Sequence, residues 1–125
     1  MLTKEQRLTL AVLGYLHFRM GRNDAAKRIF TAILAASPDE VDHLSRQSHA
    51  LLAAVAIEDG KGEAALRHLH AAMDGVLLSS REAVLHLLRA RALWLLERRD
   101  EARDAVQSYM FLVGNTGSEP EGASQ

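Results

Sequence analysis

The chain has 125 residues, of which 48% are hydrophobic and 25% are charged, and its formal net charge is -1. This length suits a single domain, and the near-neutral charge argues against nucleic acid as the main partner, because phosphate binding needs a concentrated basic surface. No cysteine is present, which excludes disulfides and fits a reducing cytosol. The first residues are charged, unlike a signal peptide, and the apolar runs are too short to span a bilayer. We therefore expect a cytoplasmic protein.

Apolar residues recur at helical spacing along the chain, and only two prolines interrupt it. Thr3 and Gln6 have the spacing of a capping box, as do Ser79 and Glu82, so each pair indicates a helix start. Gly114 is expected to end the last helix, so that a domain of residues 1–114 precedes a disordered polar tail of residues 115–125. The predicted helices run from Thr3 to Gly21, from Asn23 to the Ser37-Pro38 boundary, from about Asp39 to Asp59, from Glu63 to about Val76, from Ser79 to the corner at Arg99, and from about Glu101 to Val113.

A pair of positions repeats along the chain, a small residue followed four positions later by a bulkier apolar one: Ala26 with Phe30, Ala65 with Leu69, and Ala102 with Val106. The spacings are 65 − 26 = 39 and 102 − 65 = 37 residues, against about 34 in a tetratricopeptide (TPR) repeat. The small residue lets two helices approach closely, and the larger one fills the remaining gap. The pattern predicts an all-α fold in which three TPR-like helical hairpins, six helices in all, form a short curved solenoid. An ordinary six-helix bundle is the alternative.

Motifs for catalysis are missing from the sequence. It has no Gly-rich phosphate loop, no His-Glu-x-x-His pair and no nucleophile elbow, so we expect neither an enzyme nor a cofactor. Six histidines raise the question of a metal site. His68 and His70 point roughly 200° apart on one helix, and the spacing of His43 and His49 is also a poor match. We therefore expect no metal site.

Stacked helical hairpins curve, and the first helix of each hairpin lines the concave groove. A floor of small alanines flanked by large aromatic side chains could receive an apolar helix or extended segment of a partner. Core packing is the alternative explanation for aromatic residues at helical spacing. The predicted partner-binding residues are Leu8, Tyr15, Phe18, Ala50, Ala54, Ile57, Leu87, Arg91 and Trp94.

Four segments carry a resemblance to a known family: Leu2–Gln6, Gly14–Leu16, Leu34–Pro38 and Asp100–Tyr109. Together they resemble the YscY-type chaperones of bacterial type III secretion, which are small TPR-like proteins. The YscG-type chaperones of the needle subunit have a similar size and repeat plan, and a generic TPR scaffold is a further alternative.

The YscY resemblance implies a chaperone of the bacterial cytoplasm that binds a small secreted YscX-type protein as a heterodimer. It also implies that the pair docks on the export-gate protein of the secretion apparatus at the inner membrane. An empty apolar groove is further expected to allow self-association until the partner arrives.

Overall fold

The computed structural model describes residues 2–39, 41–74, 79 and 82–122, with side chains described as far as residue 114. In that part of the chain all regular structure is helical, which confirms the all-α class and the six helices predicted from the sequence. None of the described helices is long and apolar enough to cross a membrane. The helices are α1 (Lys4–Arg19), α2 (Asn23–Ala36), α3 (His43–Glu58), α4 (Gly62–Met73), α5 (Val84–Leu95) and α6 (Arg99–Gly122).

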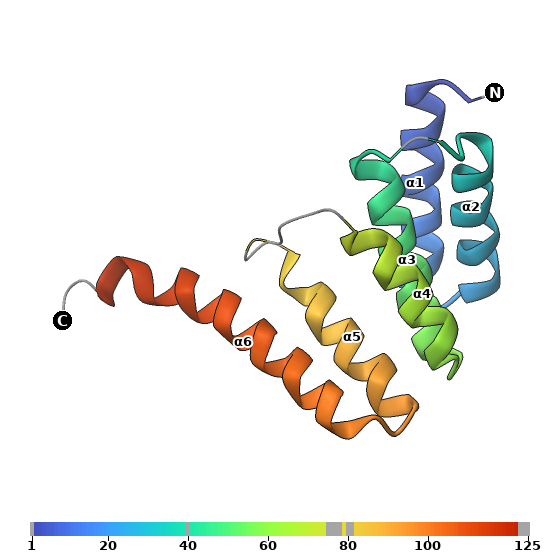
Figure 1. The fold of residues 1–125 in the computed structure, drawn as a ribbon. Helices are drawn as coiled ribbons and strands as arrows, with labels where there is room; N and C mark the ends of the chain where they lie inside the picture. The colour runs from blue at the N-terminus through green and yellow to red at the C-terminus, as the bar shows by residue number, and fades with distance from the viewer. Residues whose placement is uncertain (1, 40, 75–78, 80–81, 123–125) are drawn as a thin grey trace.

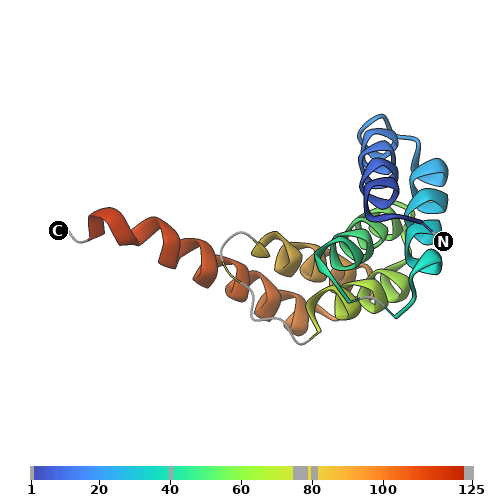
Figure 2. The same cartoon turned by 90° about the horizontal axis from the view of Figure 1, so that it is seen from above.

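Consecutive helices pair as hairpins, α1 with α2, α3 with α4 and α5 with α6 (Figure 1). The second helix of one hairpin then packs against the first helix of the next, α2 on α3 and α4 on α5. The first helices also touch one another, because α3 contacts both α1 and α5. Seen from above, α1 and α2 stand at one end of the molecule, and α6 extends away at the other (Figure 2). The hairpins are thus stacked in chain order, as in a solenoid.

The turns inside the three hairpins share one backbone feature at equivalent positions. Gly21, Gly60 and Glu97 each follow the C-cap of the first helix and have positive φ angles of 79°, 75° and 61°. Glycine adopts this left-handed conformation without steric cost, and it is common directly after a helix C-cap. Glu97 adopts it although its Cβ disfavours that region. The matching turns fix the register in which the hairpins can be compared.

Gly14 marks the close approach of α1 and α2 that the small-residue pattern predicts. A Cβ atom at this position would lie 2.9 Å from the Cζ atom of Phe30 and 3.0 Å from the Cγ2 atom of Ile29. Such distances are shorter than ordinary carbon contacts, so any larger side chain would force the helices apart. Phe30 fills the space that Gly14 leaves, and it is buried.

The core consists of three apolar clusters that follow the order of the helices. The first joins α2 to α3, the second joins α3 and α4 to α5, and the third joins α5 to α6. Each cluster therefore links neighbouring elements, and no single centre holds all six helices. The buried members of the first cluster are Ala26, Phe30, Ile33, Leu52 and Val55.

A partly buried ion pair connects the first hairpin to the second. Arg7 of α1 is 4% exposed, and its guanidinium group donates two hydrogen bonds to the Asp42 carboxylate, at 2.9 and 3.3 Å. The same carboxylate accepts a hydrogen bond of 2.9 Å from the Ser45 backbone N–H and so caps α3. The hydrogen bonds from Arg7 and Ser45 lower the pKa of Asp42 to about 2. Asp42 thus joins local helix capping to the packing of two hairpins.

The structure corrects two predicted helix starts. α3 begins at His43 after the N-cap Asp42, so the predicted start at about Asp39 is wrong. Ser37, at the predicted boundary, is the C-cap of α2. The physical reason is that Asp42 gains a tertiary partner in Arg7, which no local rule anticipates. α5 begins at Val84 without a side-chain cap, although the hydroxyl and backbone N–H of Ser79 do bond to the Glu82 carboxylate.

One predicted helix end differs from the structure, and another lies outside the described residues. α6 continues to Gly122, so the predicted end at Gly114 is wrong. Glycine lowers helix propensity by about 1 kcal/mol but keeps its N–H, so it does not block a helix as proline does. The division into a domain of residues 1–114 and a tail of residues 115–125 stays a prediction, and residues 123–125 lie outside the described part of the chain. The predicted end of the fourth helix at Val76 also lies outside it.

Candidate partner-binding groove

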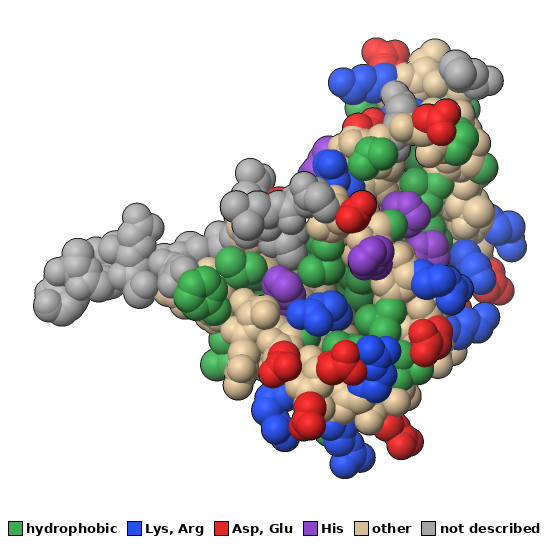
Figure 3. Space-filling view, in the orientation of Figure 1, with side chains coloured by type: hydrophobic (Ala, Val, Ile, Leu, Met, Phe, Trp, Pro, Cys, Tyr) green, Lys and Arg blue, Asp and Glu red, His purple; other side chains and the backbone are tan. Residues whose placement is uncertain are grey.

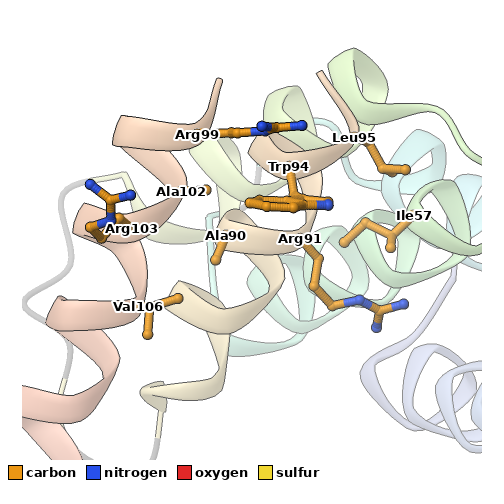
Figure 4. Close-up of a pocket in the computed structure, with 9 residues that line it drawn as sticks. All are labelled: Ile57, Ala90, Arg91, Trp94, Leu95, Arg99, Ala102, Arg103 and Val106. Carbon is orange, nitrogen blue, oxygen red and sulfur yellow. The ribbon is translucent and has the colours of Figure 1, made fainter. Parts of the chain in front are cut away.

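A pocket of about 400 Å³ opens where the end of α3 meets α5 and the start of α6. We name it the Trp94 pocket, because the indole ring of Trp94 lies in the middle of its lining (Figure 4). Three of the nine predicted partner-binding residues line it, one from α3 and two from α5. The lining consists of Ile57, Ala90, Arg91, Trp94, Leu95, Arg99, Ala102, Arg103 and Val106.

Trp94 faces the pocket rather than the core, and 60% of the residue is exposed. The guanidinium carbon of Arg99, at the start of α6, lies 5.0 Å from the centroid of its ring and is stacked over one face of it (Figure 4). A cation over the face of an indole is attracted by the ring quadrupole, which holds the ring in place. Ile57, Ala102 and Val106 contribute apolar surface to the same pocket. A large aromatic side chain presented in an apolar hollow is typical of an interface hot spot.

The charge around the Trp94 pocket has one sign. Arg91, Arg99 and Arg103 line it, and none of its lining residues is acidic. The nearest described ion pair joins Arg103 to Asp100 at 3.7 Å, and both side chains are largely exposed to solvent. Water and salt screen such a pair, so it offsets little of the positive charge. The pocket is therefore complementary to an apolar side chain with carboxylates beside it.

The predicted residues of α1 lie elsewhere. Leu8 and Tyr15 are exposed, and the Tyr15 hydroxyl accepts a hydrogen bond of 3.0 Å from Arg19 Nη1. Phe18 is half-buried against the first core cluster, which contains Phe30. None of these α1 residues lines the Trp94 pocket.

The remaining predicted residues lie between these two regions. Ala50 and Ala54 of α3 and Leu87 of α5 are half-buried, and Ala50 packs against the second core cluster. Ile57 is the point where this row of residues enters the Trp94 pocket. Since α3 contacts both α1 and α5, the row runs across neighbouring first helices.

The predicted groove did not include α6. The prediction placed the groove on the first helix of each hairpin, whereas Arg99, Ala102, Arg103 and Val106 come from a second helix. The repeat pattern held a signal for Val106, because this residue is the third equivalent of Phe30 and Leu69. Among the described helices only α5 packs against α6, which leaves Val106 partly uncovered.

Two histidines form a second cluster that sequence spacing did not suggest. The Nδ1 atoms of His49 on α3 and His68 on α4 are 3.1 Å apart, and the ring centroids are 5.3 Å apart. Histidine side chains gather over the middle of one face of the molecule (Figure 3). Burial lowers the pKa of both rings, and the positive charge that His49, Arg67 and Lys27 can carry lowers that of His68 further. Among the described residues no group of three or more metal-ligating side chains is present.

No protein-family model matches this chain, and no curated protein matches its sequence.

Proposed function

We propose that this protein is a YscY-type chaperone of bacterial type III secretion that binds a small secreted YscX-type protein. The observation that supports the proposal is the Trp94 pocket, an open apolar hollow with an exposed tryptophan and three arginines. A surface of this kind binds a partner segment that carries apolar side chains beside carboxylates. Covering the apolar segments of a secreted protein before export keeps them from aggregating.

In this proposal the protein and its partner form a heterodimer in the bacterial cytoplasm, and the pair docks on the export-gate protein at the inner membrane. The partner inserts an apolar side chain beside Trp94, and its carboxylates pair with Arg91 and Arg103 at the rim. Rim charges mainly raise the association rate, whereas the buried aromatic contact mainly slows dissociation. Substitutions of the rim arginines should therefore change mainly the association rate, and substitution of Trp94 mainly the dissociation rate.

The decisive experiment compares Trp94→Ala with Phe111→Ala. The two aromatic residues are similarly exposed, at 60% and 65%, but Phe111 lies outside the pocket. The chaperone is co-expressed with the YscX-type protein of its own secretion system, and the dissociation rate of the purified complex is measured. Trp94→Ala should raise that rate by about tenfold or more, as truncation of a hot spot does, and Phe111→Ala should leave it unchanged.

A spectroscopic measurement makes the same test without a mutation. Trp94 is the single tryptophan of the chain, so its fluorescence reports on the pocket alone when the partner lacks tryptophan. Binding should shift its emission to shorter wavelength and protect it from iodide quenching, because the ring leaves water. An unchanged spectrum in a stable complex would contradict the proposed pocket, and a complex formed only with the needle subunit would identify the YscG-type function instead.

A further inference from the structure

The first and second hairpins can be aligned, so that each residue of α1 has an equivalent residue in α3. Gly21 and Gly60 have nearly the same positive φ angle, and they lie as far apart as Ala26 and Ala65. Each position of α1 therefore corresponds to the position of α3 that follows it by 60 − 21 = 39 residues. Equivalent positions in stacked hairpins normally meet equivalent neighbours.

One pair of positions breaks this equivalence. Leu52 and Val55 of α3 are 4% and 1% exposed, because they pack against α2 in the first core cluster. Their counterparts in α1 are Leu13 and Leu16, which are 45% and 50% exposed. Among the described residues α1 packs against α2 and α3 alone, so nothing occupies the place that α2 occupies beside α3.

The bare surface is larger than these two leucines. Val12 and Met20, one on either side along the helix, are also exposed. We call the four residues Val12, Leu13, Leu16 and Met20 the α1 edge. The opposite side of α1 packs against the hairpin through Gly14, so the helix is apolar on two faces. An apolar face of a helix is ordinarily covered by another element.

We propose that the α1 edge binds an amphipathic helix of a partner protein, placed against α1 as α2 is placed against α3. The contact inside the chain defines the chemistry of that helix. Ala26, Phe30 and Ile33 of α2 pack in one cluster with Leu52 and Val55, the α3 counterparts of Leu13 and Leu16. The partner helix carries the same order of side chains on one face: a small residue, a large apolar residue four positions later, and an aliphatic residue three positions after that.

Charge completes the description of the partner. In the α2–α3 contact, Asn23 at the start of α2 donates a hydrogen bond of 2.8 Å to the carboxylate of Glu58 at the end of α3. The α1 counterpart of Glu58 is Arg19, which is exposed and positive. The first turn of the partner helix lies over Arg19, and a carboxylate there gains both the ion pair and the favourable end of its own helix dipole.

The same reasoning rejects a second copy of this chain as the occupant. The outer face of α6, with Val106 and Met110 exposed, is the part of a second copy that would continue the stack. In that register Arg99 takes the place of Asn23 and meets Arg19, so two arginines face each other. Such a head-to-tail contact also does not close and would build open filaments. The α1 edge is formed without α5 and α6, so the inference goes beyond the proposed function of the Trp94 pocket.

A peptide made from α2 itself tests the α1 edge. The probe has the sequence of residues 22–37 with two substitutions. Asn23→Asp places a carboxylate opposite Arg19, and Thr31→Asp supplies an aspartate that a lactam joins to Lys27. Both lactam positions are exposed in α2, so the apolar face stays free. The cross-link offsets the marginal helicity of a short free peptide. Binding of the fluorescent peptide to the full chain is measured by anisotropy.

Two matched variants locate the binding surface. Leu16→Glu should weaken peptide binding by about tenfold or more, because a carboxylate then faces apolar surface, and Val84→Glu, at a similarly exposed position on α5, should leave it unchanged. The peptide with Phe30→Ala should also bind about tenfold more weakly. Arg19→Glu in the protein should weaken binding of the peptide that carries Asn23→Asp and strengthen binding of a peptide that carries Asn23→Lys.

Several outcomes would overturn the inference. One is a peptide that does not bind, and another is binding that Leu16→Glu leaves unchanged. If Trp94→Ala abolishes peptide binding, the peptide binds in the Trp94 pocket and not at the α1 edge. If Trp94→Ala binds the peptide normally, the α1 edge is a separate site from the proposed chaperone site. Self-association of the free protein that Leu16→Glu abolishes in sedimentation velocity would make a second copy the occupant and refute the partner helix.

Discussion

The second and third hairpins have the same plan but differ in what covers them. Leu69 of α4 and Val106 of α6 hold equivalent positions, four residues after the small alanines Ala65 and Ala102. Leu69 is 1% exposed because α5 packs over α4, whereas Val106 is 36% exposed because, among the described helices, none but α5 packs against α6. A core position in one repeat has become a pocket wall in the next.

The comparison explains where this molecule can bind partners. A solenoid buries each hairpin against its neighbours, so the outer faces of the hairpins at the two ends of the described stack have no neighbour within it, and such faces are ordinarily polar. Here those faces are the α1 edge at one end and the surface of α6 beside Trp94 at the other. The middle hairpin, packed on both sides, contributes stability instead.

The two hairpins should differ most in the stability that is lost when the equivalent side chains Leu69 and Val106 are truncated. Leu69→Ala should lower the free energy of unfolding by about 3 kcal/mol, because it leaves a cavity among α3, α4 and α5. Val106→Ala should change it by about 0.5 kcal/mol or less, as exposed positions do. Urea denaturation of both variants measures the difference. Equal losses would show that α6 is covered in solution.

The middle hairpin also brings two partly buried ionisable groups together. The pKa values of His49 and His68 are lower in the folded chain than the ordinary value of 6.5, since burial disfavours the charged rings. The unfolded chain then binds more protons, so the stability is complete above about pH 7 and falls as the pH drops below the unfolded pKa. Lys27 and Arg67 act in the same direction on His68.

Urea denaturation at about pH 7 and about pH 5 measures that fall. The double variant His49→Gln, His68→Gln should show a smaller loss between the two pH values than the natural sequence. His70→Gln, at an exposed position of α4, is the control and should behave like the natural sequence. An identical pH dependence in all three proteins would refute the role of the buried pair.

The smallest expected effect lies in the turn of the third hairpin. Glu97 has a φ angle of 61°, where the first two hairpins have Gly21 and Gly60. Glu97→Gly should raise the stability by about 0.5 kcal/mol, because relief of the steric cost slightly outweighs the added entropy of the unfolded chain. Gly60→Ala should lower it by about 1 kcal/mol. Thermal unfolding measures both, and a loss of stability in Glu97→Gly would show that its side chain stabilises the turn.

The local signals at Ser79 and Gly114 did not mark a helix start and a helix end, whereas other local signals were confirmed. The turn at Gly21 and the capping box at Thr3 follow from neighbouring residues. These features suffice for the helical class and the pairing of helices, because backbone preference and close packing act over a few residues. The prediction that Ile57, Arg91 and Trp94 share a surface also used only repeat positions, and these three residues do line one pocket.

Contacts between residues on different helices, within a hairpin or between hairpins, were decided by the tertiary structure alone. α3 begins after the N-cap Asp42 because Arg7, far away in the sequence, pairs with the Asp42 carboxylate. His49 and His68 meet because α3 and α4 cross at that point, which spacing along one helix does not show. The arginines of α6 reach the Trp94 pocket through the fold of the last hairpin. The sequence by itself thus determined the repeated unit, and the stacking of the units decided which apolar faces are buried and which remain open, since burial depends on neighbours that no local pattern contains.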